Sequence, residues 1–267
     1  VFLIAACVSI LAVALICIFL FANGIPAIGK IGVGNFLLGT EWRPLKEIFG
    51  IFPMIVGSLY VTAGAILFGV PIGLLCAIFM ARFCPKKLYK VLKPLVDLLA
   101  GIPSIVYGLF GMLFFVTKLH WGYSMIAGAF TLAIMVLPVI MRTTEEALIA
   151  VPDSYREGSF GLGAGKLRTV FTIVLPSAMP GILSGVILAT GRIVGETAAL
   201  IYTASSVAKI PSSVFSSTRT LAVHMYLLSN EGLYIGQTYG TAVVLLVLVL
   251  AINLAARLAK TKLKQKQ

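Results

Sequence analysis

The sequence contains few charged residues. Only 11% of its 267 residues carry a charge, whereas the figure for a soluble domain is about 25%. A charge content this low, together with 60% hydrophobic residues, excludes an ordinary soluble domain and predicts a membrane protein. We expect one helical transmembrane domain over residues 1–267, with no room for an added soluble domain.

Cysteine and histidine are also scarce. The four cysteines lie within or at the end of apolar runs, without Cys-x-x-Cys spacing. Only two histidines are present, His120 and His224. The sequence therefore predicts neither a metal site nor a cofactor.

Long runs with little or no charge predict six transmembrane helices, because only a helix can cross lipid as a single segment with its backbone groups satisfied. The expected spans are Val1–Ala22, Pro53–Ala81, Pro94–Thr117, Trp121–Met141, Pro176–Thr203 and Ile235–Ala256. We interpret the first as a retained helix, since its apolar run is too long for a cleaved signal.

The basic residues predict the orientation. Most of the 21 Lys and Arg residues fall in the loop Arg82–Lys93, the segment Arg142–Arg168 and the tail that begins at Arg257. With six spans these segments share one side, and the positive-inside rule puts that side and both termini in the cytoplasm. The net charge of +12 is then an orientation signal and a contact for anionic membrane lipids, and no nucleic-acid partner is expected.

One polar segment between spans has an ordered pattern. It reads Glu157-Gly158-Ser159, three residues, Gly163, nine residues, then Ile173-Val174-Leu175-Pro176. We expect a helix start at Thr143–Glu146, a short helix over Ser154–Leu162, a glycine turn that includes Gly161 and Gly163, and a helical pattern over Leu167–Leu175. Two short helices at a glycine hinge would project from the membrane and transmit the movement of a soluble partner.

The glycines of this segment do not form a nucleotide site. The stretch from Gly161 to Lys166 has Phe160 where a phosphate-binding loop needs Gly, and Leu167 where it needs Ser or Thr. We therefore expect that the chain does not bind ATP itself.

Arg192 and Glu196 are charged residues inside the fifth expected span. Their spacing of four puts them on one face of a continuous helix, and a charge at membrane depth costs several kcal/mol unless it is paired or lines water. The same face carries small or hydroxyl-bearing residues: Ser184, Gly185, Gly195, Ala199 and Thr203. We interpret Arg192 as the ligand of a tetrahedral oxyanion, with Glu196 holding the guanidinium or accepting a proton. The alternative is an ion pair that only locks two helices together.

The motifs resemble those of a known family. The Glu157–Pro176 spacing is similar to the coupling loop of ABC-importer permeases, and Gly191-Arg192-Ile193-Val194-Gly195-Glu196-Thr197 resembles a signature of the phosphate-importer permeases of the PstC/PstA family. The stretch Phe36–Pro44, with Trp42, is similar to an external loop of the PstC-type subunit, whereas Ala198-Ala199-Leu200 is closer to the PstA type. The loop with Trp42 favours a PstC-like subunit.

The resemblance implies an all-α, six-helix type I importer permease of the MetI-like fold. Its partners would be a second permease subunit, two ATPase subunits that hydrolyse ATP, and an external phosphate-binding protein, with inorganic phosphate as cargo and the bacterial inner membrane as location. It implies a translocation role for Arg192, Glu196, Thr197 and Ser184. It implies ATPase coupling through Glu157, Gly158, Ser159, Gly161, Gly163, Leu175 and Pro176, and docking of the binding protein on Asn23–Phe52 and Ala204–Tyr234.

Other functions stay open at this point. The chain would fit a permease for another oxyanion or small solute in the same importer class. A proton-linked secondary anion carrier would use Arg192 and Glu196 without a soluble partner. A membrane enzyme is disfavoured, because Glu145-Glu146 is the only adjacent acidic pair and no histidine lies near it.

Overall fold

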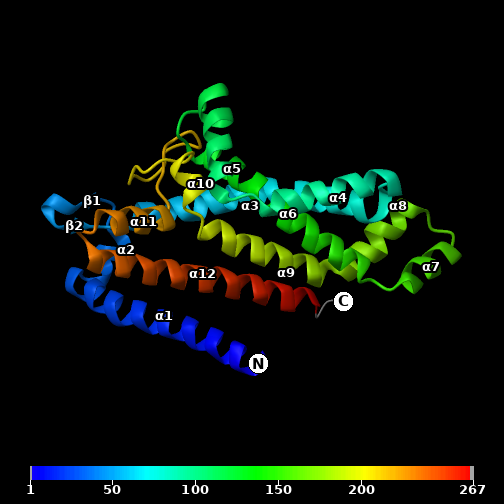
Figure 1. Cartoon of the computed structure of the whole chain (residues 1–267), viewed down its shortest axis with the longest axis horizontal. Helices are drawn as coiled ribbons and strands as arrows, with labels where there is room; N and C mark the ends of the chain where they lie inside the picture. Colours follow the sequence, from blue (N-terminus) through cyan, green and yellow to red (C-terminus); the bar gives the residue numbers. More distant parts are fainter. Residues whose placement is uncertain (1, 265–267) are drawn as a thin grey trace.

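Most of the chain forms helices that run roughly along one direction (Figure 1). The computed structural model describes residues 2–264, apart from the side chains of residues 259, 260 and 262–264. Part of the basic tail used to predict orientation, namely Lys260, Lys262, Lys264 and Lys266, therefore lies outside the described side chains, as does Val1.

The helices that correspond to the expected spans, with their continuations, are α1 (Phe2–Ile31), α3 (Phe52–Ile78) with the π-helical turn Phe79–Phe83, α4 (Lys86–Gly101), α5 (Ser104–Gly111) with the π-helical turn Met112–Lys118, α6 (Met125–Ile149), α9 (Leu175–Val194) and α12 (Ile235–Lys264). The shorter elements are α2 (Val33–Leu38), α7 (Asp153–Gly161), α8 (Lys166–Thr169) with the π-helical turn Val170–Val174, α10 (Ala198–Ile201) and α11 (Leu221–Glu231). The strands β1 (Trp42–Arg43) and β2 (Ile48–Phe49) pair antiparallel around a 3₁₀ turn at Pro44–Lys46.

The centre of the bundle is the contact between α3 and α6, and small residues allow it. A Cβ at Gly73 of α3 would lie 2.8 Å from Cγ2 of Ile140 on α6, which is too close for a side chain. Gly181 and Gly185 of α9 allow the same kind of close approach to Ala147 and Thr143 of α6. Small residues let helices pack at short distance, and this matters in a membrane because the hydrophobic effect does not drive helices together in lipid.

Within residues 2–264, five helices are long and apolar enough to span a membrane, and α4 with α5 provides a sixth candidate as a bent pair. The first expected span is confirmed as a helix, although α1 continues to Ile31. It lies at the edge of the bundle beside α12, and its most apolar stretch is not buried by the rest of the chain. The apolar surface of α1 is therefore available to lipid or to another subunit.

The third expected span, Pro94–Thr117, is wrong as a straight helix. The axes of α4 and α5 differ by 95°, and Ile102 between them has extended backbone with φ −69° and ψ 130°. Pro103 explains the break, because its ring disfavours helical backbone at the preceding residue and it has no N–H to donate. The helix also begins earlier than expected, at Lys86.

The fourth span ends later than expected. We predicted a helix start at Thr143–Glu146, but these residues continue α6, which ends at Ile149. Pro152 follows, and α7 begins immediately after it. The fixed φ of proline and its missing donor suit the start of a helix and not its interior.

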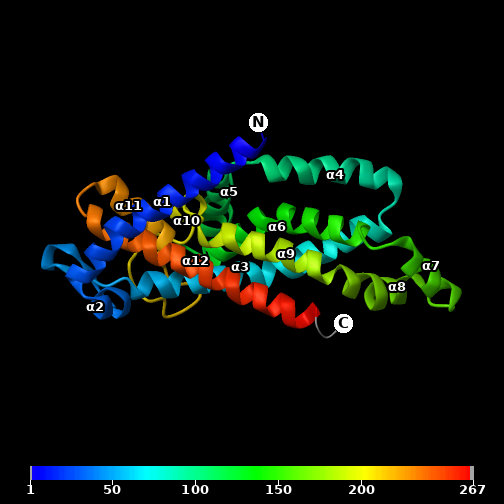
Figure 2. The same cartoon turned by 90° about the horizontal axis from the view of Figure 1, so that it is seen from below.

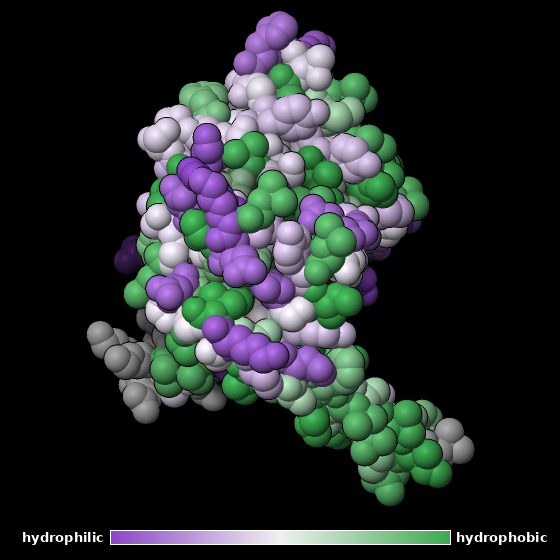
Figure 3. All heavy atoms as spheres, turned by 90° about the vertical axis from the view of Figure 1, so that its left-hand side faces the viewer, coloured by the Kyte–Doolittle hydropathy of each residue, from purple (hydrophilic) through white to green (hydrophobic). Residues whose placement is uncertain are grey.

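The two ends of the bundle differ in what they carry. One end holds α2, the β1–β2 hairpin and α11, and the opposite end holds α7 and α8 (Figures 1 and 2). The free ends of α1 and α12 both point toward the end with α7 (Figure 1). The face at the hairpin end shows many hydrophilic residues, in contrast to the hydrophobic helix beside it (Figure 3).

Candidate functional site: a cavity between α9 and α12

Arg192 lines an open cavity of about 990 Å³ between α9 and α12. Its side chain is exposed, and it stands in the last turn of α9. Ser184, two turns earlier, lines the same cavity and donates a hydrogen bond to the carbonyl of Pro180 at 2.9 Å. Arg192 and Ser184, two of the residues predicted to line a translocation path, therefore line the same open cavity.

Glu196 does not brace Arg192, so this prediction is wrong. Helix α9 ends at Val194, and Gly195 is its C-cap, so Arg192 and Glu196 do not share a continuous helix. The carboxylate of Glu196 is 9% exposed and accepts a hydrogen bond from the backbone N–H of Ala199 at 3.2 Å. The ion pairs among the described residues do not join it to Arg192.

The break after α9 gives Glu196 a different role. Glu196 precedes the short helix α10, whose first N–H groups have no partner inside the helix. A carboxylate at this position accepts a hydrogen bond from one of these groups, and its negative charge is favourable at the positive end of the helix dipole. Thr197 occupies the N-cap position of α10, and its hydroxyl donates to the carbonyl of Gly195 at 3.4 Å. The fifth expected span, Pro176–Thr203, is thus a helix, a two-residue break after the C-cap and a second short helix.

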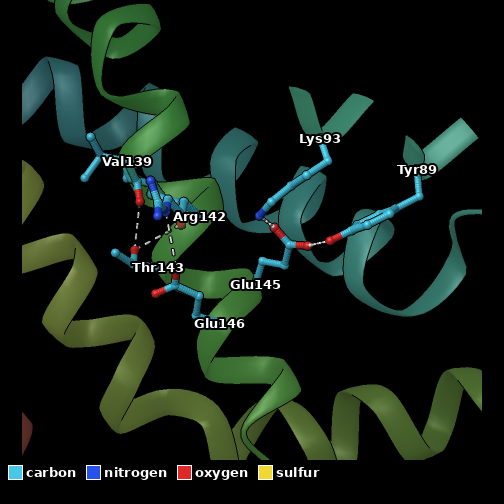
Figure 4. A network of polar contacts seen from close by, with 8 residues as sticks. Tyr89, Lys93, Val139, Arg142, Thr143, Glu145 and Glu146 are labelled. Atoms are coloured by element: carbon cyan, nitrogen blue, oxygen red, sulfur yellow. Dashed lines mark hydrogen bonds and ion pairs between the residues drawn. The ribbon is translucent and has the colours of Figure 1, made fainter. Parts of the chain in front are cut away.

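A second charged cluster was missed from the sequence. The carboxylate of Glu145 on α6 is 4% exposed and lies between two groups of α4 (Figure 4). The hydroxyl of Tyr89 donates to its Oε1 at 2.5 Å, and Nζ of Lys93 donates to Oε2 at 2.6 Å. The neighbouring Glu146 points away and pairs with Arg142 at 3.2 Å on the surface (Figure 4). We name the Tyr89–Glu145–Lys93 contact the α4–α6 clip.

The clip explains how α4 is held. No residue of α4 is buried, so apolar packing gives this helix little support. A buried carboxylate with an ion pair and a second hydrogen bond is a strong local attachment, because its removal leaves charges and donors unpaired. The sequence signal was the adjacent pair Glu145-Glu146, of which only the first faces the protein.

The predicted coupling segment forms two short helices with a glycine turn. Helix α7 confirms the expected helix over Ser154–Leu162, and Gly163 has φ +79°, a conformation that favours glycine. The hydroxyls of Ser159 and Thr169 lie 2.9 Å apart and tie α7 to α8. From Lys166 the chain stays helical through Leu175 and Pro176 into α9. Movement of α7 is therefore connected to the helix that carries Arg192.

The surface of the coupling segment is mixed. Glu157, Gly158 and Gly161 are exposed, and a Cβ at either glycine would meet no neighbouring atom. Tyr155, Phe160 and Leu162 are exposed by 52%, 42% and 90%. Exposed apolar side chains on a polar projection are typical of a protein contact surface.

At the opposite end the hairpin is fixed to α11 by His224. Trp42 of β1 packs edge-on against the His224 ring, with centroids 4.3 Å apart, and Nη1 of Arg219 lies 3.1 Å from Nδ1. Because a guanidinium only donates, Nδ1 accepts and the imidazole is neutral. Burial, helped by the charge of Arg219, lowers the pKa of His224 from 6.5 to about 3.

Over the described residues, no group of three or more His, Cys, Asp or Glu side chains is arranged to hold a metal ion. The cavity has an aliphatic lining with arginine, amide and hydroxyl groups as its polar members. Such groups bind anions by hydrogen bonds and charge.

Residues 69–266 match the family described as "Binding-protein-dependent transport system inner membrane component". A probable ABC transporter permease protein, YqgI of Bacillus subtilis, is 36% identical over 234 residues, which cover 81% of this chain and 80% of that protein. Phosphate transport system permease proteins also match: PstC of Mesorhizobium japonicum is 31% identical over 88% of this chain and 79% of its own length, and PstA 1 of Mycobacterium tuberculosis (strain H37Rv) is 35% identical over 79% and 70%.

Solved structures support the same fold. A chain of the MetNI methionine ABC transporter, in an inward-facing conformation, superposes with a TM-score of 0.69 at 21% identity and covers 84% of this chain and 99% of its own. A chain of a bacterial alginate ABC transporter, in complex with an alginate pentasaccharide-bound periplasmic protein, gives 0.62 at 15% identity, with 94% and 92% covered.

The motifs, the helical bundle and these relatives agree: this chain is a multi-pass inner-membrane protein with a MetI-like, type I importer permease fold, and it belongs to the family of binding-protein-dependent transport permeases that includes the PstC and PstA phosphate permeases.

Proposed function

We propose that this chain is a translocation subunit of an ATP-driven phosphate importer. The observation that carries the proposal is the position of Arg192, whose guanidinium lines an open cavity between two membrane helices. A fixed cation at membrane depth is costly unless it meets water or an anion. The PstC and PstA relatives support phosphate as that anion.

A second permease subunit would complete the path. The cavity is open, and α1 leaves its apolar face uncovered by its own chain. A second permease that covers the opening between α9 and α12 would close the cavity and exclude lipid from Arg192. Ser184 would line the path, and Glu196 with Thr197 would hold the break between α9 and α10 rather than bind cargo directly.

Two ATPase subunits would dock on the segment that includes residues 143–175. The exposed apolar side chains of α7 and its C-cap, Tyr155, Phe160 and Leu162, provide the contact surface. The Ser159–Thr169 contact and the unbroken helix through Leu175 and Pro176 would pass its movement to α9. ATP hydrolysis would take place on those subunits, with α7 and both termini in the cytoplasm.

An external phosphate-binding protein would dock at the opposite end. The hairpin carries exposed Arg43 and Glu41 and a Leu45 side chain that is 97% exposed. The hydrophilic end face offers the surface for such a contact (Figure 3). The periplasmic protein bound in the alginate transporter supports a partner of this class.

The test is uptake of labelled phosphate by the complete importer in proteoliposomes, with ATP inside and binding protein outside. Arg192→Gln should lower uptake at least about tenfold, the cost expected when a charged hydrogen bond is lost, while co-purification with the ATPase subunits is unchanged. Wild-type uptake in this variant would refute the cargo role of Arg192. Uptake that needs a proton gradient but no ATP would instead indicate a secondary carrier.

A further inference from the structure

The cavity has a second cationic wall, which α12 supplies. The α12 lining residues are spaced four apart and form one stripe along the helix: Val249, Asn253, Arg257 and Thr261. The α9 lining residues also share one face: Ser184, Ile187, Leu188, Gly191 and Arg192. Arg257, which the sequence alone places in a basic tail, is thus part of the wall opposite Arg192.

The cavity is positively charged and has no internal counter-charge. Arg192 and Arg257 both line it, and none of the lining residues is acidic. The ion pairs among the described residues involve neither arginine. Two guanidinium groups that line one open cavity repel each other, and an anion bound in the cavity reduces that repulsion. The arrangement therefore favours an anionic ligand.

Asn253 adds a hydrogen-bond acceptor to the same wall. Its Oδ1 is enclosed and receives no hydrogen bond from the described protein atoms. An enclosed acceptor without a partner is unfavourable until something donates to it. An oxyanion that carries a proton can donate, whereas sulfate at neutral pH cannot.

We propose that Arg257 is a second anion ligand of this cavity, and that Oδ1 of Asn253 accepts a hydrogen bond from the protonated oxygen of the bound oxyanion. The site would take a tetrahedral oxyanion that is partly protonated, with α9 and α12 each supplying a guanidinium group to the cavity. Arginine suits this role because its planar fork binds two oxygens at once and keeps its charge. The identity of the anion rests on the proposed function, but the involvement of Arg257 does not.

The experiment uses the complete importer in proteoliposomes, with ATP-driven uptake and anion-stimulated ATP hydrolysis measured for phosphate, arsenate and sulfate. We expect Arg257→Gln to raise the KM for phosphate about tenfold or more, with part of the effect recovered in Arg257→Lys. Asn253→Leu should reduce the preference for phosphate over sulfate. Lys87→Gln, which removes an exposed positive charge from α4, is the matched control and should leave KM unchanged.

An unchanged KM in Arg257→Gln, with Arg192→Gln impaired, would overturn the proposal and leave the proposed function intact. Stimulation of the wild type by another oxyanion and not by phosphate would refute the phosphate function, and loss of that stimulation in Arg257→Gln would still support the anion site. If Arg257→Gln does not assemble with the ATPase subunits, Arg257→Met replaces it, because methionine keeps most of the aliphatic part of the side chain without the charge. The KM of Arg257→Met then tests the proposal by the same two outcomes.

Discussion

Substitution of Glu145 should detach α4 from the bundle. In Glu145→Ala, the ammonium of Lys93 and the hydroxyl of Tyr89 both lose their acceptor. Breaking a fully buried ion pair costs about 3–5 kcal/mol, but Lys93 is 30% exposed and water compensates part of this. We expect a loss of about 3 kcal/mol for Glu145→Ala and about half that for Glu145→Gln, which can still accept from Tyr89.

The loss should be local, because α4 has no buried residue and its main interhelical contact is with α6. Hydrogen exchange of the purified importer should show faster exchange over Lys86–Gly101 in Glu145→Ala. Glu146→Ala is the control: its pair with Arg142 is about 60% exposed, so it should change stability by less than about 0.5 kcal/mol.

A double-mutant cycle gives the sharper result. Glu145→Ala, Lys93→Met and the double variant should show a coupling energy of at least about 1 kcal/mol. Additive effects, or equal effects of Glu145→Ala and Glu146→Ala on the exchange of α4, would refute the clip.

Gly163→Val should impair ATPase attachment or uncouple hydrolysis from uptake, because φ +79° costs a residue with a side chain at least about 1–2 kcal/mol. Gly165→Ala, at a glycine with φ −72° and open space around its Cβ, should be tolerated, and normal coupling in Gly163→Val would contradict the role of the turn. Acidification should destabilise the hairpin end, because neutral His224 has a pKa of about 3 in the folded state and 6.5 unfolded. The free energy of unfolding should be constant above pH 6.5 and fall as the pH drops toward 3, by about 2 kcal/mol at pH 5. His224→Leu should lose this dependence, which urea titrations at several pH values would detect.

The sequence predicted the hydrophobic segments well and their geometry less well. Apolar length predicted the segments that became α1, α3, α6, α9 and α12, because hydropathy is a sum over neighbouring residues. The 95° bend before Pro103 was missed although its signal was present, since proline restricts the residue before it. The end of α9 at Gly195 was missed because glycine occurs in membrane helices both at breaks and at close contacts.

For the site, the sequence identified Arg192 and Ser184 but paired the arginine with the wrong partner. An i, i+4 spacing brings side chains together only if the helix continues, and α9 does not. The contacts of Glu145 were missed, because its partners Tyr89 and Lys93 are more than fifty residues away in sequence.

By itself, the sequence determined that the chain enters a membrane, which segments are apolar enough to do so and which segment carries the coupling pattern, because these depend on local composition and spacing. Only the tertiary structure decided which charges meet. It placed Glu196 on α10, joined Glu145 to α4 and turned Arg257 into the cavity of Arg192, because such contacts depend on where helices break and on which faces of distant helices are brought together.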